Sequence, residues 1–146
     1  MSSAFKFRLD KLLEIRMEEE EESKRIFNEN SRKKQFIEDK LEELNQNYDK
    51  YKGINPDEDV VYQKLKRYYI KGLQDGIAQT EKDLVKQSRE VEKRRVQLKE
   101  KQIKRKTVEV LKDKKKMEFL REQDRIEQVT IDELALYSYM RNENNI

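Results

Sequence analysis

The sequence has 146 residues, of which 45% are charged and 34% hydrophobic, and its formal net charge is +3. So few apolar residues exclude a large buried core, and so small a net charge gives no strong field to recruit nucleic acid or an anionic membrane. Disordered chains have a similar composition, so sustained apolar periodicity has to distinguish a helical protein from them. With three Gly and one Pro in the whole chain, the structural elements must be long.

The first predicted element is a helix from about residue 5 to 52. Steps of four and three residues along it give a row in which eight of 13 positions are apolar. This 3.5-residue period is typical of a coiled-coil seam, in which polar positions cost stability but fix the register. The row consists of Leu9, Leu13, Arg16, Glu20, Ser23, Phe27, Asn30, Lys34, Ile37, Leu41, Leu44, Tyr48 and Tyr51.

A tight turn is predicted at residues 53–55. Gly53 suits the left-handed conformation at a helix C-terminus, Asn55 can cap the next helix, and Pro56 and Glu58 suit its first turn. A connection this short makes the two helices antiparallel neighbours whose residue numbers add to roughly 108 at each pair. This register leaves the second helix without a partner beyond about residue 105, so it overhangs. It also sets the acidic residues 18–22 near residues 86–90.

The second helix is predicted from about residue 56 to 128, with an apolar row and a more polar companion row. The first row is Ile70, Ile77, Leu84, Val91 and Leu98, and its companion is Leu73, Thr80, Gln87, Arg94 and Lys101. Farther along, a different row becomes apolar, which indicates that the seam rotates or faces another partner. This later row is Val96, Ile103, Val110 and Met117.

The last segment, residues 130–146, allows two interpretations. Thr130 and Glu133 form a capping-box pattern that favours a short separate helix, whereas the β-branched run from Val129 to Ile131 equally allows one continuous helix. The expected fold is therefore all-α, a single domain over residues 1–146. It is a long two-helix antiparallel coiled-coil hairpin with a helix-two overhang and, in one alternative, a short C-terminal helix.

The residue types needed for catalysis are missing. The chain has neither His nor Cys, which removes the commonest general base and the thiolate nucleophile, and it has no glycine-rich phosphate loop. A two-helix protein also offers no water-excluded pocket that would tune its carboxylates. We therefore expect no enzyme, catalytic residue, metal, cofactor or small-molecule substrate, and a function in binding proteins. The missing Cys, signal peptide and transmembrane run favour a cytosolic protein.

Two surfaces remain as binding candidates. Residues 86–116 contain 14 basic and five acidic residues, but seam positions interrupt them, so we expect solvated surface or an acidic protein groove rather than nucleic acid. Tyrosines gather near the turn, beside Gly72 and Gly76, each of which costs about 1 kcal/mol in a helix interior. This pattern favours a protein-binding patch. Alternatively, Tyr48 and Tyr51 only fill the seam and the glycines are tolerated.

The opening residues carry a recognisable motif. Phe5-Lys6-Phe7-Arg8-Leu9-Asp10-Lys11-Leu12-Leu13-Glu14-Ile15-Arg16 resembles the start of the flagellar export protein FliJ family. The segments Arg121-Glu122-Gln123 and Asp132-Glu133-Leu134-Ala135 are similar to the end of the family's sequences. The chain length and the layout of two long helices joined by a tight turn agree with the resemblance, which covers nearly the whole chain.

The resemblance implies a cytoplasmic component of the flagellar type III export apparatus, located peripherally at the inner face of the cell membrane at the flagellar base. It implies three partners: the hexameric export ATPase, for which the chain acts as a central stalk, the membrane protein of the export gate, and export chaperones. The ATPase-facing residues would be Phe5, Phe7, Arg8, Leu9, Leu12, Leu13 and Arg16, with the overhang of the second helix. The gate-facing residues would be Leu44, Tyr48, Tyr51, Tyr69, Leu73, Gly76 and Thr80. A generic coiled-coil adaptor or spacer, and the equivalent stalk of a virulence type III secretion system, remain alternatives.

Overall fold

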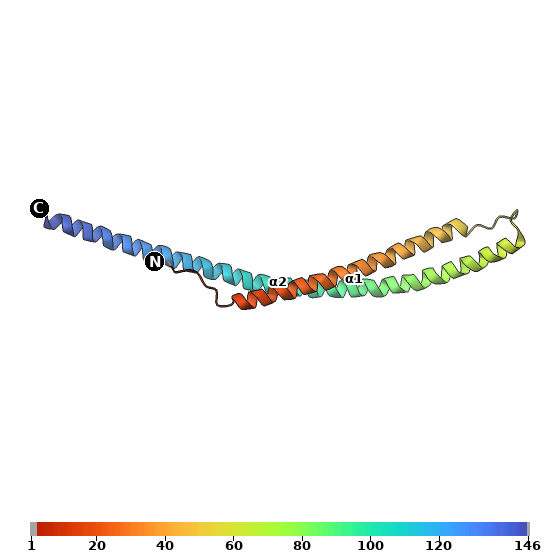
Figure 1. Ribbon diagram of the computed structural model, residues 1–146, viewed down its shortest axis with the longest axis horizontal. Helices are drawn as coiled ribbons and strands as arrows, with labels where there is room; N and C mark the ends of the chain where they lie inside the picture. Colours follow the sequence, from red (N-terminus) through yellow and green to blue (C-terminus); the bar gives the residue numbers. More distant parts are fainter. Residues whose placement is uncertain (1–2, 146) are drawn as a thin grey trace. The chain divides into compact units, whose positions relative to one another are not determined.

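A computed structural model describes residues 3–145 of the chain. It contains two helices, α1 over Asp10–Tyr51 and α2 over Val60–Asn144, joined by a loop at residues 52–59 (Figure 1). The described residues form no β-strand. The predicted all-α helical hairpin is confirmed.

The described residues pack as two compact parts. The hairpin part is Glu19–Lys101, and the terminal part combines residues 3–18 with residues 102–145. The assignment of the whole chain to a single domain stays a prediction.

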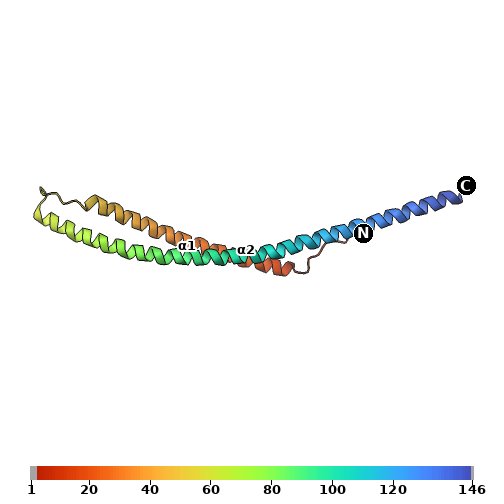
Figure 2. The ribbon, with the colours of Figure 1, turned by 180° about the vertical axis from the view of Figure 1, so that it is seen from behind.

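In the hairpin part, α1 and the first half of α2 lie side by side and run antiparallel, as the opposite views of Figures 1 and 2 both show. The rings of Tyr51 and Tyr69 meet edge to face, with their centroids 5.3 Å apart. At the other end of this part, the Lys101 ammonium lies 3.6 Å from the Glu19 carboxylate. The order of these contacts along the two helices establishes the antiparallel direction.

The predicted seam rows are the ones that pack. On α1, every position of the row from Leu13 to Tyr51 is buried or half-buried. On α2, both rows from Ile70 to Lys101 are also buried or half-buried, and Leu73 and Thr80 are only 5% and 3% exposed. The 3.5-residue period therefore identified the contact faces of both helices.

The polar middle of the seam contains a hydrogen-bonded pair of amides. The Gln87 amide donates to the backbone oxygen of Asn30 at 3.0 Å and to its side-chain oxygen at 3.2 Å. The Asn30 amide in turn donates to the backbone oxygen of Ile26 at 2.9 Å. Both side chains are half-buried, and a slipped register would separate them. This pair therefore favours one alignment of α1 and α2.

The predicted turn at 53–55 is wrong in length, and α2 begins four residues later than expected. Asn55 does not cap a helix. Its backbone oxygen accepts from the Glu58 amide at 3.1 Å and its side-chain oxygen accepts from the Asp57 amide at 3.2 Å, which closes a turn. The Gln63 side chain holds this turn by donating to the backbone oxygens of Asn55 and Glu58, both at 3.1 Å. Gly53 does not adopt a positive φ, so the expected left-handed helix end is absent too.

The longer loop shifts the register of the hairpin. Paired residue numbers add to about 120 rather than 108, because α2 extends beyond the end of α1 before the two helices meet at Tyr51 and Tyr69. The expected contact between residues 18–22 and 86–90 is therefore wrong. Glu19, which belongs to this acidic run, forms an ion pair across the seam with Lys101 instead.

In the terminal part, helix α1 begins at Asp10 rather than near residue 5. Residues 3–7 have no regular secondary structure, and the Asp10 amide donates to the Phe7 backbone oxygen at 3.2 Å. Alternate residues of an extended segment point to the same side, so Phe5 and Phe7 can both reach α2, which a helix would not allow. The carboxylate of Asp10 also suits the positive end of the helix dipole.

The contacts of this N-terminal segment place the overhang of α2 later than predicted. Val108 packs with Phe7 and Leu13, the Lys112 ammonium lies 2.9 Å from the Asp10 carboxylate, and the rings of Phe5 and Phe119 are 5.6 Å apart. Helix α2 therefore has partners as far as Phe119, not only to about residue 105. Within the described part of the chain, its unpartnered end comprises residues 120–144, whose side chains are exposed except for half-buried Gln123.

The expected rotation of the seam onto a new row does not occur. Val96, Ile103, Val110 and Met117 are exposed in the structure, whereas the original row continues through half-buried Arg105 and Lys112. Long basic side chains can cover a seam with their aliphatic stems while the charged group stays in water. The second alternative, that the exposed row faces another partner, stays a prediction.

The C-terminal segment belongs to α2, which runs without interruption to Asn144. The hydroxyl of Thr130 donates to the Ile126 backbone oxygen at 2.9 Å, a bond inside the helix rather than a cap. Threonine is tolerated within a helix when its hydroxyl bonds in this way to the preceding turn. The alternative of a separate short helix at 130–146 is therefore wrong.

Exposed ion pairs along the helices explain many of the carboxylates. Glu22 with Arg25, Glu92 with Arg95, and Glu122 with Arg125 each form such a pair three residues apart. Hydrogen bonds from the arginines hold the pKa of each of these glutamates below its usual value. The stabilisation from a lowered pKa is present above the usual glutamate range and is lost as the pH falls through the lowered value. These carboxylates support helical structure and are not set up for proton transfer.

A first prediction concerns the glycines of α2. A Cβ atom added to Gly72 would meet no atom within 4 Å, and one added to Gly76 would make ordinary contact with Leu44 at 3.7 Å. Gly72→Ala should therefore raise the free energy of unfolding by about 0.5–1 kcal/mol, since alanine loses less conformational freedom in a helix. Urea unfolding followed by circular dichroism measures this, with Gly76→Ala expected to shift in the same direction. A lower midpoint for Gly72→Ala would contradict the described helix.

A second prediction concerns Asn30 and Gln87. Replacing both with leucine should raise the free energy of unfolding by about 1 kcal/mol. Apolar side chains then occupy both half-buried positions, and no polar group is left there without a hydrogen-bond partner. The same variant should lose its unique register and form dimers, which sedimentation velocity detects. Gln87→Leu alone is the control, and it should lower stability by about 1 kcal/mol. A monomeric double variant would show that the amide pair does not specify the register.

Candidate protein-binding surfaces

All seven predicted ATPase-facing residues lie in the terminal part, and four of them pack together against α2. Phe7 and Leu13 are buried with Val108, and Phe5 and Leu12 pack against this cluster. In the free chain these side chains therefore hold the N-terminal segment against α2. Contact between them and a partner protein stays a prediction.

The remaining members of that set are more accessible. Arg8 and Leu9 are exposed, and Arg16 is half-buried. Arg8 and Leu9 border a groove of about 670 Å³ between the N-terminal segment and α2. The other residues that line this groove are Ala4, Phe5, Lys6, Phe7, Leu111, Lys115 and Phe119. An apolar groove edged by cations is a suitable surface for another protein.

The end of α2 presents a second exposed apolar surface in the terminal part. Its apolar side chains lie on several sides of the helix, and this scatter explains why no periodic signal in the sequence identified them. Water-exposed apolar groups at this density are typical of a binding surface. The exposed residues are Leu120, Ile126, Val129, Ile131, Leu134, Leu136, Tyr137, Tyr139 and Met140.

The predicted gate-facing residues lie along the hairpin part, and several of them make contacts near its loop end. Tyr69 packs on Tyr51, Leu44 lies against the backbone of Gly76, and the Gln74 amide reaches the Tyr48 hydroxyl at 3.5 Å. Within this set the burial differs. Leu73 and Thr80 are buried in the seam, whereas Tyr69 is exposed. Tyr69 is therefore the member of the set best placed for contact, and the ring of Tyr51 packs against it.

A further apolar surface lies at the same end, and sequence reasoning indicated only its tyrosine. Val60, Val61, Leu65 and Tyr68 are exposed, and Tyr68 is 80% exposed. They lie in the first turns of α2, before its pairing with α1 begins at Tyr69. In the sequence, these apolar residues come before Ile70, the first position of the apolar seam row of the second helix. The exposure of these residues was not predicted, because α2 was expected to pair with α1 from its first turn.

Residues 3–145 contain no group of three or more acidic side chains arranged to hold a metal ion. No helix in this part of the chain is long and apolar enough to cross a membrane.

Comparison with known proteins identifies the family. The model of the family described as "Flagellar FliJ protein" matches residues 5–144. No curated protein and no solved structure matches the chain. The family match covers almost the whole sequence, including the Phe-x-Phe-Arg-Leu opening and the unpartnered end of α2. The chain therefore belongs to the flagellar FliJ protein family, whose members are non-catalytic components of flagellar protein export.

Proposed function

We propose that this chain is the central stalk of the flagellar type III export apparatus, at the cytoplasmic face of the membrane at the flagellar base. Its terminal part binds the hexameric export ATPase. Its hairpin part binds the membrane protein of the export gate, and the chain also receives export chaperones. The observation that carries this proposal is the family match over residues 5–144, which includes the apolar end of α2.

The terminal part supports the ATPase contact. The exposed apolar side chains beyond Phe119 lie on all sides of a single helix, so one flat partner surface cannot cover them. The central opening of a protein ring can enclose such a helix. The buried Phe7 and Leu13 support this end by fixing the N-terminal segment to α2, and Arg8 and Leu9 remain exposed for contact.

The stalk acts through unequal contacts. One helical chain within a ring of six identical subunits cannot contact all six in the same way. It therefore stabilises the conformation of one subunit interface over the others, and differential binding of this kind shifts the populations of conformational states. When nucleotide hydrolysis changes which interface is favoured, the contact between the ring and the stalk changes with it. Hydrolysis and the position of the stalk are coupled in this way.

The hairpin part supports the gate contact. Exposed Tyr69, braced by Tyr51, presents a large and rigid aromatic surface next to Gly76 and Leu44. Tyrosine is enriched at binding hot spots because it buries much area with little loss of rotamer entropy. A spacer that only separates other components has no need of such a surface. The family match favours the flagellar apparatus over a virulence secretion system.

A third prediction tests the ATPase contact. Purified cognate export ATPase should hydrolyse ATP faster when this protein is added at about one copy per six subunits, because one stalk serves one ring. Leu134→Glu combined with Tyr137→Glu should reduce the stimulation about tenfold, since two charges would enter an apolar contact. Phosphate release gives the rate. Phe36→Glu, an equally exposed apolar position on α1, is the matched control and should stimulate normally.

An unchanged rate with the unmodified protein, at every ratio tested, would contradict the stalk function and leave an adaptor or spacer. Equal loss of stimulation in Phe36→Glu would show that the two glutamates at the end of α2 act through general charge rather than through a specific contact.

A fourth prediction tests the gate contact. Tyr69→Ala should weaken binding of the cytosolic region of the export-gate protein by about five- to tenfold, because truncating a central aromatic side chain costs on the order of 1 kcal/mol or more. Isothermal titration calorimetry measures this. Tyr139→Ala removes the same side chain from the end of α2 and should bind normally. Equal weakening by the two substitutions would remove the assignment of the gate contact to the hairpin part.

A further inference from the structure

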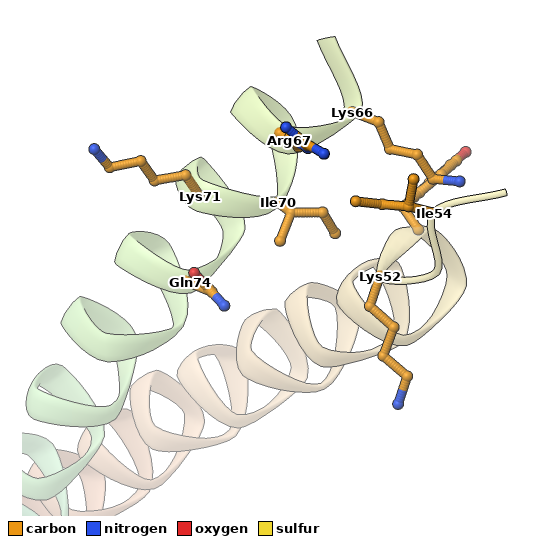
Figure 3. Close-up of a pocket in the computed structure, with 8 residues that line it drawn as sticks. Lys52, Ile54, Lys66, Arg67, Ile70, Lys71 and Gln74 are labelled. Carbon is orange, nitrogen blue, oxygen red and sulfur yellow. The ribbon is translucent and has the colours of Figure 1, made fainter. Parts of the chain in front are cut away.

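The loop end of the hairpin part contains a groove that no predicted partner surface accounts for. Its volume is about 350 Å³, and it lies between the start of the loop and the early turns of α2 (Figure 3). Tyr51 is the single gate-facing residue that it includes. The lining residues are Tyr51, Lys52, Ile54, Lys66, Arg67, Ile70, Lys71 and Gln74.

The groove has an apolar centre. Ile54 projects from the loop and Ile70 from α2, and their side chains face one another across the groove in Figure 3. Ile70 is half-buried, but Ile54 is 47% exposed even though it lies beside other apolar groups. The edge-to-face pair of Tyr51 and Tyr69 lies next to this centre. One bulky apolar side chain of a partner would remove this surface from water.

Basic side chains surround that centre, and no carboxylate lines the groove among the described residues. Two of the cations have partners outside the lining. The Lys66 ammonium, on a side chain only 11% exposed, lies 3.4 Å from the Glu58 carboxylate, and the Lys52 ammonium lies 3.3 Å from that of Asp49. Arg67 and Lys71 form no ion pair with any residue of the described chain. The groove therefore has two uncompensated positive charges beside an apolar centre.

We propose that this groove binds an extended acidic segment of a partner protein, with one bulky apolar side chain between Ile54 and Ile70 and carboxylates on Arg67 and Lys71. Arg67 can bind a carboxylate through two parallel hydrogen bonds. A peptide strand fits a groove between a loop and a helix. An anionic bilayer is too flat to enter this groove, which has an apolar centre between the loop and α2.

This inference goes beyond the proposed function, because the groove is defined without reference to the ATPase or to the exposed face of Tyr69. The gate protein is the expected source of the acidic segment, and that identification alone rests on the proposed function.

The experiment measures fluorescence anisotropy of labelled peptides titrated with the full chain. The probe is Asp-Glu-Leu-Glu-Asp. Its amide counterpart, Asn-Gln-Leu-Gln-Asn, removes the charge, and Asp-Glu-Ser-Glu-Asp removes the apolar side chain. The acidic leucine peptide should bind about tenfold more tightly than either control at low salt, and its affinity should fall as salt screens the charges.

Two variants locate the binding. Arg67→Glu with Lys71→Glu should weaken binding of the acidic peptide by about tenfold or more, and Ile54→Ala should weaken it about threefold, since Ile54 lies in an exposed loop and its loss does not disturb the seam. Lys82→Glu with Lys86→Glu is the matched control, with the same charge change and the same four-residue spacing on α2, and should bind normally.

Three results would overturn the inference: no difference between the acidic and amide peptides, equal weakening in the two charge-reversal variants, or binding to phosphatidylglycerol vesicles without binding to the peptide. The ATPase assay separates the two proposals. Arg67→Glu with Lys71→Glu should lose peptide binding but stimulate hydrolysis normally, which would show that the groove acts independently of the ATPase contact. If the unmodified protein binds the peptide but does not stimulate hydrolysis, the stalk function is contradicted and the groove proposal stands.

Discussion

A contact seam only about two side chains wide holds the helices of this protein together. With 45% of its residues charged, the chain has too few apolar groups to surround either helix. Among residues 3–145, the buried hydrophobic side chains are Phe7, Leu13 and Val108 in the terminal part and Leu73 in the hairpin part. The remaining seam positions are half-buried, so many small contacts share the stabilisation. Two consequences follow from this constraint. The register depends on polar as well as apolar pairs, and most of the surface of both helices stays available to other proteins.

The polar seam positions show how such a structure remains specific. A uniformly apolar seam could slip by a heptad with little loss, whereas the amides of Asn30 and Gln87 find each other in one alignment. Lys101 with Glu19 has the same effect in the hairpin part, and Lys112 with Asp10 in the terminal part. Each exposed ion pair contributes little free energy on its own. What these pairs contribute is discrimination between registers, which a narrow seam otherwise lacks.

The candidate binding surfaces arise where one helix lacks its neighbour. In the terminal part, α2 continues beyond Phe119 with exposed apolar side chains, and in the hairpin part its first turns precede the contact between Tyr51 and Tyr69. Exposed apolar surface in water is unfavourable, so it favours association with partner proteins. The family of this chain functions in flagellar protein export. Surfaces at helix ends suit a protein that connects other components of such an apparatus.

The sequence by itself determined the helical hairpin, the faces that pack and the family, because heptad periodicity and the Phe-x-Phe-Arg-Leu opening are local patterns that can be read from residue order. It could not determine the register. That depends on how the loop folds, and the side chain of Gln63 stabilises an eight-residue loop by binding the backbone at Asn55 and Glu58, where local rules predicted a three-residue turn. The candidate sites divide in the same way. The residue types around Tyr69 and Phe5 were identifiable from the sequence, but the burial of Leu73, Thr80 and Phe7 depends on the neighbouring helix. The groove at Ile54 and Arg67 also needed the tertiary structure, because only the folded loop brings the two sides of the groove together.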